Sequence, residues 1–151
     1  GAIQLGPVVE DSLLLVEHAL NKGKIAVETL LPEVPPVAMD AGEMQQVVIN
    51  LILNAAQAMG QEGRLSLALK REVRDGVDGV ALEVRDSGPG IASENLSSLF
   101  DPFFTTRRGE GTGLGLSISQ SIVQGGGGLI SAANAEGGGA VFTVWLPVAA
   151  A

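Results

Sequence analysis

Residues 50–54 of this chain read Asn-Leu-Ile-Leu-Asn, residues 86–90 read Asp-Ser-Gly-Pro-Gly, and residues 111–116 read Gly-Thr-Gly-Leu-Gly-Leu. Each stretch is a weak signal alone, because Asn pairs and glycine-rich turns occur in many folds. Their combination, in this order within one short chain, is specific. The combination of the three stretches therefore identifies the fold better than the predicted helices and strands around them do.

The first stretch belongs to a predicted amphipathic helix. Asp40 and Glu43 have the spacing of a capping box, in which the N-cap carboxylate and a Glu three residues later satisfy the first free N–H groups. Apolar residues then recur at intervals of three and four from Met44 to Ala55, so one stripe faces the core until Gly60 ends the helix.

Alternating apolar and polar residues predict strands around the second stretch. Residues 64–73 have the two-residue period, residues 75–79 turn the chain, and residues 80–84 form the next strand, which leads into Asp86. Shorter strands are predicted at residues 25–30, 37–39, 129–133 and 140–146. Two more helices are predicted, at residues 8–21 and from Leu116 to the four glycines at 125–128. These elements fit an α+β fold with a mixed, largely antiparallel sheet and three helices on a single face.

The two asparagines of the first stretch lie one helical turn apart and point the same way. Mg²⁺ prefers oxygen ligands and bridges phosphate oxygens while keeping several waters, so Asn50 and Asn54 can present two amide oxygens to one ion. For an isolated Asn pair, hydrogen bonding to nearby backbone groups is the commoner role. The later stretches favour the metal.

The second stretch follows an apolar strand. A carboxylate at Asp86 can accept a hydrogen bond from the exocyclic amine of adenine, whereas guanine offers an acceptor at that edge. Gly88 and Gly90 allow the main chain to approach the ring, and Ile91 follows them. The same Asp-x-Gly-x-Gly pattern also occurs in ordinary turns.

The third stretch precedes a helix, so its free N–H groups and the positive helix end can hold phosphate oxygens. It is not a P-loop, since no Gly-Lys-Ser/Thr follows, and it is too apolar for a linker. The preceding loop, residues 93–110, is mostly polar but contains the aromatic residues Phe100, Phe103 and Phe104, a composition that suits a lid over the ligand. A minor core cluster is the alternative role of these aromatics.

Composition excludes several other functions. A formal net charge of −8, with only nine Lys and Arg residues, argues against a nucleic-acid partner. No apolar run reaches the ~18 residues of a membrane span, and neither cysteine chemistry nor a His-rich metal site is available. We expect a single domain over residues 1–151, in which residues 1–6 form a linker. We expect this domain to be cytoplasmic, to be monomeric in isolation and to make no membrane contact, whether the whole protein is soluble or membrane-anchored.

The three stretches, together with Leu99-Phe100-Asp101-Pro102-Phe103-Phe104-Thr105-Thr106 between the last two, resemble the N, G1, F and G2 boxes of the catalytic ATP-binding domain of sensor histidine kinases, members of the GHKL superfamily. Gly137-Gly138-Gly139 resembles the last glycine box. The resemblance extends from about Pro7 to Pro147 and is closest in motif style to nitrogen-regulatory kinases. It implies the two-layer GHKL (Bergerat) ATP-binding fold with a flexible ATP lid over about residues 93–111.

The resemblance further implies that the domain binds ATP and Mg²⁺ and donates the γ-phosphoryl group to a histidine on a separate dimerisation and phosphoacceptor domain, for later transfer to a response regulator. Asn50 and Asn54 are the expected Mg²⁺ ligands, and Asn50 and Arg107 the expected catalytic residues. The expected ATP-binding residues are Asn50, Asn54, Asp86, Gly88, Gly90, Ile91, Phe100, Thr105, Thr106, Arg107, Gly111, Thr112, Gly113, Leu114, Gly115 and Leu116.

Two other functions remain to be weighed. Gyrase-like and mismatch-repair relatives, which act as ATP-driven clamps, carry a general-base glutamate one turn before the Mg-binding Asn. This chain has Asn50 there, which disfavours hydrolysis. The intact boxes also disfavour a degenerate module that binds a partner but no nucleotide.

The chain departs from the family at three positions. No phosphoacceptor box is present: His18 lacks the downstream Arg-Pro, so we interpret it as a surface or packing histidine. Gly126 stands where the family commonly has His, and Arg107 replaces a usual Lys.

Overall fold

The computed structural model describes residues 2–101 and 115–150. Over these residues the chain forms, in order, α1 (Leu5–Leu15), α2 (Glu17–Lys22), β1 (Ile25–Leu30), α3 (Ala41–Met59), β2 (Gly63–Arg74), β3 (Val77–Asp86), α4 (Ser93–Leu96), α5 (Gly115–Gly125), β4 (Leu129–Asn134) and β5 (Ala140–Pro147). The strands make one sheet in the order β1-β2-β3-β5-β4. The pair β1–β2 is parallel and the other pairs are antiparallel.

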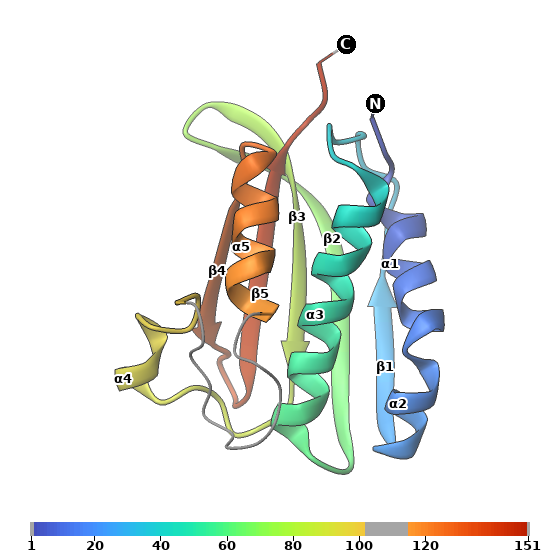
Figure 1. The fold of residues 1–151 in the computed structure, drawn as a ribbon, viewed down its shortest axis with the longest axis vertical. Helices are drawn as coiled ribbons and strands as arrows, with labels where there is room; N and C mark the ends of the chain where they lie inside the picture. Colours follow the sequence, from blue (N-terminus) through green and yellow to red (C-terminus); the bar gives the residue numbers. More distant parts are fainter. Residues whose placement is uncertain (1, 102–114, 151) are drawn as a thin grey trace.

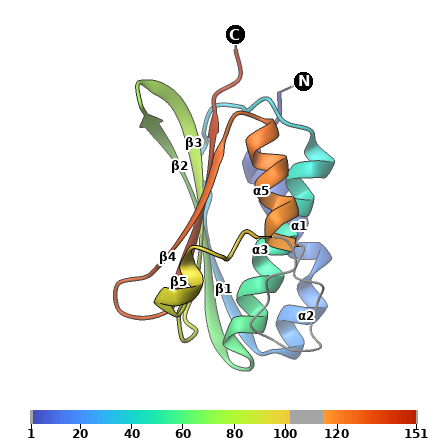
Figure 2. The same cartoon turned by 60° about the vertical axis from the view of Figure 1, so that its left-hand side comes forward.

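The structure has two layers. Figures 1 and 2 show α1, α2, α3 and α5 on one face of the sheet, with α4 outside this layer. The predicted α+β sandwich with a mixed, mostly antiparallel sheet is therefore confirmed. No helix of the described residues is both long and apolar enough to cross a membrane.

The core lies between α3 and the central strands. The apolar stripe of α3 is buried as its spacing predicts, and so are the alternating leucines of β2, Leu65, Leu67 and Leu69. These leucines pack with inward-facing residues of β3 and β5 such as Leu82 and Leu146. Burying each such side chain contributes about 1.5–3 kcal/mol, so this core fixes α3 against the central strands.

The opening helix differs from the single helix predicted over residues 8–21. The structure begins a helix at Leu5 and breaks it at Val16, whose φ of −109° and ψ of 12° leave the helical range. The hydroxyl of Ser12 donates to the carbonyl of Val8 at 2.7 Å, a bond that tends to bend helices. The break lets the two halves pack differently, because α1 contacts α3 whereas α2 contacts β1.

Two other predicted segments are shorter than expected. Residues 37–39 form no strand, and Val37 makes only isolated bridges to Ile3 and Val148. The preceding Pro35 and Pro36 have no N–H to donate, which limits pairing there. The turn predicted over residues 75–79 occupies only Asp75 and Gly76, and positive φ at both, 49° and 77°, is typical of a two-residue hairpin.

The β2–β3 hairpin is reinforced by side-chain contacts on both faces of the sheet. Trp145 lies against Gly79 and donates its indole N–H to the carbonyl of Glu72 at 2.8 Å. Arg74 hydrogen-bonds the carboxylate of Glu72 and lowers its pKa from the ordinary value. Arg71 does the same for the pKa of Asp78, with Nε at 2.9 Å from Oδ1.

The capping box yields a stability prediction. The backbone N–H of Glu43 donates to Asp40 Oδ2 at 2.9 Å, as predicted. Asp40→Ala should lower the free energy of unfolding by about 1 kcal/mol because this N–H loses its partner. Asp40→Asn, which keeps an acceptor, is the matched control. Urea denaturation measures both, and an equal loss in the two variants would contradict the capping role.

Candidate functional site

A cavity of about 240 Å³ lies where α3, the end of β3 and the segment before α4 meet. Four sequence-predicted residues line it: Asn54, Asp86, Gly90 and Ile91. The remaining lining residues are Ala58, Ala92, Asn95, Leu99, Ala140 and Phe142. The fold thus brings the first two stretches together around one space whose lining combines apolar side chains with polar groups that can orient a ligand.

Asp86 is the charged residue of this cavity. It ends β3 and is only 3% exposed. Its Oδ1 accepts from the backbone N–H of Gly88 at 2.9 Å and from that of Ala140 at 3.3 Å. Burial of a carboxylate is costly unless it is hydrogen-bonded, and these main-chain donors supply that compensation. Among the described residues, donors reach only Oδ1.

The turn between β4 and β5 packs directly on Asp86. Gly139 has a φ of +83°, and a Cβ added there would lie 1.9 Å from the carbonyl oxygen of Asp86. Only glycine allows this approach. Gly139 therefore lets the β4–β5 turn pack directly against the main chain of Asp86.

Asn134, at the end of β4, is a site residue that the sequence analysis missed. Its Oδ1 accepts from the backbone N–H of Ile91 at 2.6 Å and its Nδ2 donates to the carbonyl of Ile91 at 2.9 Å. Gly90 adopts a φ of +84° beside this amide, where a Cβ would lie 2.7 Å from Asn134 Oδ1. Asn134 thus holds the main chain that forms the cavity wall.

The two predicted metal ligands on α3 have different surroundings. Asn50 Nδ2 donates to the carbonyl of Gly115 and to Ser119 Oγ, both at 3.3 Å, and so ties α3 to α5. Asn54 lines the cavity instead. No cluster of three or more His, Cys, Asp or Glu side chains suited to a metal occurs in residues 2–101 and 115–150. The side-chain amide oxygens of Asn50 and Asn54 are of a type that a hard cation such as Mg²⁺ accepts.

The described part of the predicted lid contains the short helix α4. Phe100 makes an edge-to-face contact with Phe142 of β5, with ring centroids 6.3 Å apart and planes at 79°. Phe100 is half-buried against the core, so it has the core-packing role that the sequence left open for these aromatics.

Several predicted site residues lie outside the described residues: Phe103, Phe104, Thr105, Thr106, Arg107, Gly111, Thr112, Gly113 and Leu114. Gly115 is the first residue of α5, and Leu116 packs against the core. Gly88 lies close to the C-terminal end of α3, since a Cβ there would be 3.3 Å from the carbonyl oxygen of Ala58.

Comparison with known protein families gives one matching description. The family of histidine kinase-, DNA gyrase B-, and HSP90-like ATPases matches residues 39–150, which include every site residue named above. The sensor histidine kinase ZraS of Escherichia coli (strain K12) is 41% identical over 148 residues, which cover 97% of this chain and 31% of ZraS. The chain thus spans about a third of the length of this curated relative.

Solved structures are similar over the whole chain. The nucleotide-free catalytic domain of the histidine kinase ThkA superposes with a TM-score of 0.84 at 33% identity, covering 97% of this chain and 94% of that one. ThkA in complex with the response regulator TrrA gives a TM-score of 0.79 at 32% identity, covering 99% of this chain and 42% of that one.

The close contact between Gly139 and the carbonyl oxygen of Asp86 can be tested by a matched pair of substitutions. Gly137→Ala and Gly139→Ala both place alanine at positive φ, at a cost of about 1–2 kcal/mol, but a Cβ at Gly137 meets nothing within 4 Å. Gly139→Ala should therefore lower the free energy of unfolding by about 1–3 kcal/mol more than its control, because its Cβ is forced into the Asp86 carbonyl. Equal losses in thermal denaturation would contradict the contact.

Proposed function

We infer that this chain, which belongs to the family of histidine kinase-, DNA gyrase B-, and HSP90-like ATPases, binds Mg-ATP and donates the γ-phosphoryl group to a histidine on a separate domain. The chain is the ATP-binding catalytic domain of a sensor histidine kinase. We propose that the acceptor histidine lies on the kinase's own dimerisation and phosphoacceptor domain and that a response regulator receives the group afterwards. The complex of the related ThkA with TrrA supports the second partner.

The buried carboxylate of Asp86 is the observation that carries the assignment of the nucleotide site. Its Oδ1 is fixed by two backbone donors, and we assign Oδ2 to the exocyclic amine of adenine. The apolar lining residues Ile91, Leu99 and Phe142 would contact the faces and edge of the purine. A guanine would place its carbonyl oxygen against the carboxylate, so the site selects adenine.

We assign Mg²⁺ to the amide oxygens of Asn54 and Asn50. The Nδ2 donor of Asn50 is directed at α5, which leaves its Oδ1 as the ligating atom. A Mg²⁺ ion held by these amide oxygens would supply positive charge that neutralises the charge developing on the phosphates during transfer. Through its Nδ2 bonds Asn50 would also hold the start of α5, where the phosphates would bind, close to the metal ligands on α3. Arg107 stays the predicted cation for the terminal phosphates.

The alternative is a clamp that hydrolyses ATP, as in gyrase-like relatives. Asn50 cannot accept a proton from water, because its amide is not basic and its Nδ2 already donates to Gly115 and Ser119. Phosphoryl transfer through a loose transition state needs positioning and charge neutralisation more than a strong base. Transfer to an acceptor on another domain is therefore favoured over hydrolysis.

Asp86→Asn tests adenine recognition without disturbing the fold. The Asn Oδ1 can still accept from Gly88 and Ala140, while Nδ2 turns a donor toward the adenine amine. Affinity for an Mg-bound non-hydrolysable ATP analogue should fall by about ten- to a hundredfold, since a charge-assisted hydrogen bond of about 1.5–3 kcal/mol is lost. Calorimetry measures the affinity and thermal denaturation checks the fold. Unchanged affinity would sink the assignment.

Labelling with γ-³²P-ATP separates transfer from hydrolysis. The chain alone should not label itself, because its single histidine, His18, is exposed on α2 and lacks a phosphoacceptor motif. Adding the dimerisation domain of the same kinase should produce an acid-labile, histidine-linked label on that domain. Label on the chain alone that is lost in His18→Ala would contradict the first expectation. Steady ATP turnover without acceptor would favour the clamp.

A further inference from the structure

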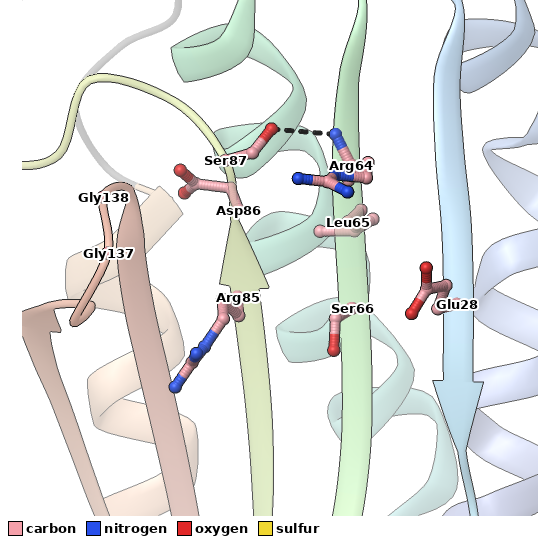
Figure 3. Close-up of a pocket in the computed structure, with 9 residues that line it drawn as sticks. All are labelled: Glu28, Arg64, Leu65, Ser66, Arg85, Asp86, Ser87, Gly137 and Gly138. Carbon is pink, nitrogen blue, oxygen red and sulfur yellow. Dashed lines mark hydrogen bonds between the residues drawn. The ribbon is translucent and has the colours of Figure 1, made fainter.

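A second cavity, of about 450 Å³, lies on the opposite face of the sheet from the helices. Figure 3 shows its residues at the ends of β1, β2 and β3 and in the β4–β5 turn: Glu28, Arg64, Leu65, Ser66, Arg85, Asp86, Ser87, Gly137 and Gly138. Asp86 borders this cavity as well as the proposed nucleotide cavity. The nucleotide assignment uses none of the outward-facing side chains here.

Two arginines dominate the second cavity. Ser66 pairs with Arg85 in the antiparallel register of β2 and β3, and the backbone N–H of Arg64 donates to Ser87 Oγ at 2.9 Å. Arg64 and Arg85 therefore lie diagonally across neighbouring strands on one face. Diagonal neighbours of this kind are about 7–8 Å apart at Cα, within the reach of long side chains.

Neither arginine has an acidic partner within the described part of the chain. Further along β2 the cations are paired: Lys70 lies 3.5 Å from Glu83 and 3.4 Å from Glu72, and Arg71 and Arg74 contact carboxylates of the hairpin. No described carboxylate comes within 4 Å of Arg64 or Arg85. The N–H donors of both guanidinium groups therefore remain available to an anion.

We propose that this cavity binds a small oxyanion, a phosphate or a carboxylate, between Arg64 and Arg85. Planar guanidinium groups match both anions and can form paired N–H···O bonds to them. The hydroxyl of Ser66 and the main chain of Gly137 and Gly138 supply further polar groups around the same space. Figure 3 shows Arg64 and Arg85 on adjacent strands, with the Arg85 side chain extended toward β5 and away from Arg64, so binding one anion between them requires Arg85 to change its side-chain rotamer.

Glu28 sets the limit on affinity. It pairs with Ser66 in the parallel register of β1 and β2, so its carboxylate borders the cavity on the side away from Arg85. The net charge of −8 also repels anions from the molecule as a whole. Binding therefore depends on the local pair of arginines, and removal of the Glu28 charge should strengthen it.

The test is a titration of the ¹⁵N-labelled chain with inorganic phosphate at constant ionic strength, followed by NMR. Backbone signals of Ser66, Arg85, Ser87 and Gly138 should shift and saturate. Arg64→Gln and Arg85→Gln should each weaken phosphate binding by about tenfold, the value of one charge-assisted hydrogen bond. Glu28→Gln should tighten it. A parallel titration with acetate distinguishes a phosphate site from a general carboxylate and phosphate site.

Arg71→Gln is the matched control, because it removes the same charge from the same strand but from a residue already paired with Asp78. It should leave phosphate affinity unchanged. Shifts that do not saturate, or an equal loss in Arg71→Gln and Arg85→Gln, would overturn the proposal. The result is separable from the nucleotide assignment, since Asp86→Asn removes a second carboxylate from the border of the cavity and should tighten phosphate binding, as Glu28→Gln does, while it weakens nucleotide binding.

Discussion

The organisation of this domain depends on one buried carboxylate. Asp86 lies at the end of a central strand, where a charge is tolerated only if main-chain donors compensate for the lost hydration. Those donors come from Gly88, just after the strand, and Ala140, at the start of β5. The tight approach of Gly139 and the glycine-rich path after Asp86 both follow from this requirement. The carboxylate and one of its two donors, Ala140, both line the cavity.

Much of the fold could be predicted because its signals are local. The cap at Asp40, the apolar stripe of α3 and the alternation of β2 are properties of single segments, and each agrees with the structure. The break at Val16 could not be predicted in this way, because it depends on α1 and α2 packing against different partners. The pairing of residue 37 depends on two distant segments, Ile3 and Val148, and the prolines before it.

The candidate site was predictable where residues carry their chemistry in a motif, as Asn54, Asp86 and Gly90 do. Asn134 has no such motif: an asparagine at a strand end is typical of any turn, and only the meeting of β4 with the segment after β3 reveals its two bonds to Ile91. Asn50 shows the opposite case. Its position in the helix was clear from the sequence, but the bonds of its amide to α5 depend on how the two helices pack.

The position of β5 in the sheet bears on how the domain is made. Among the described strands β5 comes after β4 in the sequence, yet it is inserted between β3 and β4 and brings the Ala140 donor to Asp86. During synthesis the earlier segments emerge first. A nascent chain therefore contains the Asp86 carboxylate before it contains the Ala140 donor. The hydrogen bonds at the end of β3 are completed only when β5 has been synthesised and inserted into the sheet. Proteolytic loss of β5 would remove one of the two main-chain donors to Asp86 and would leave β3 as an unpaired edge of the sheet.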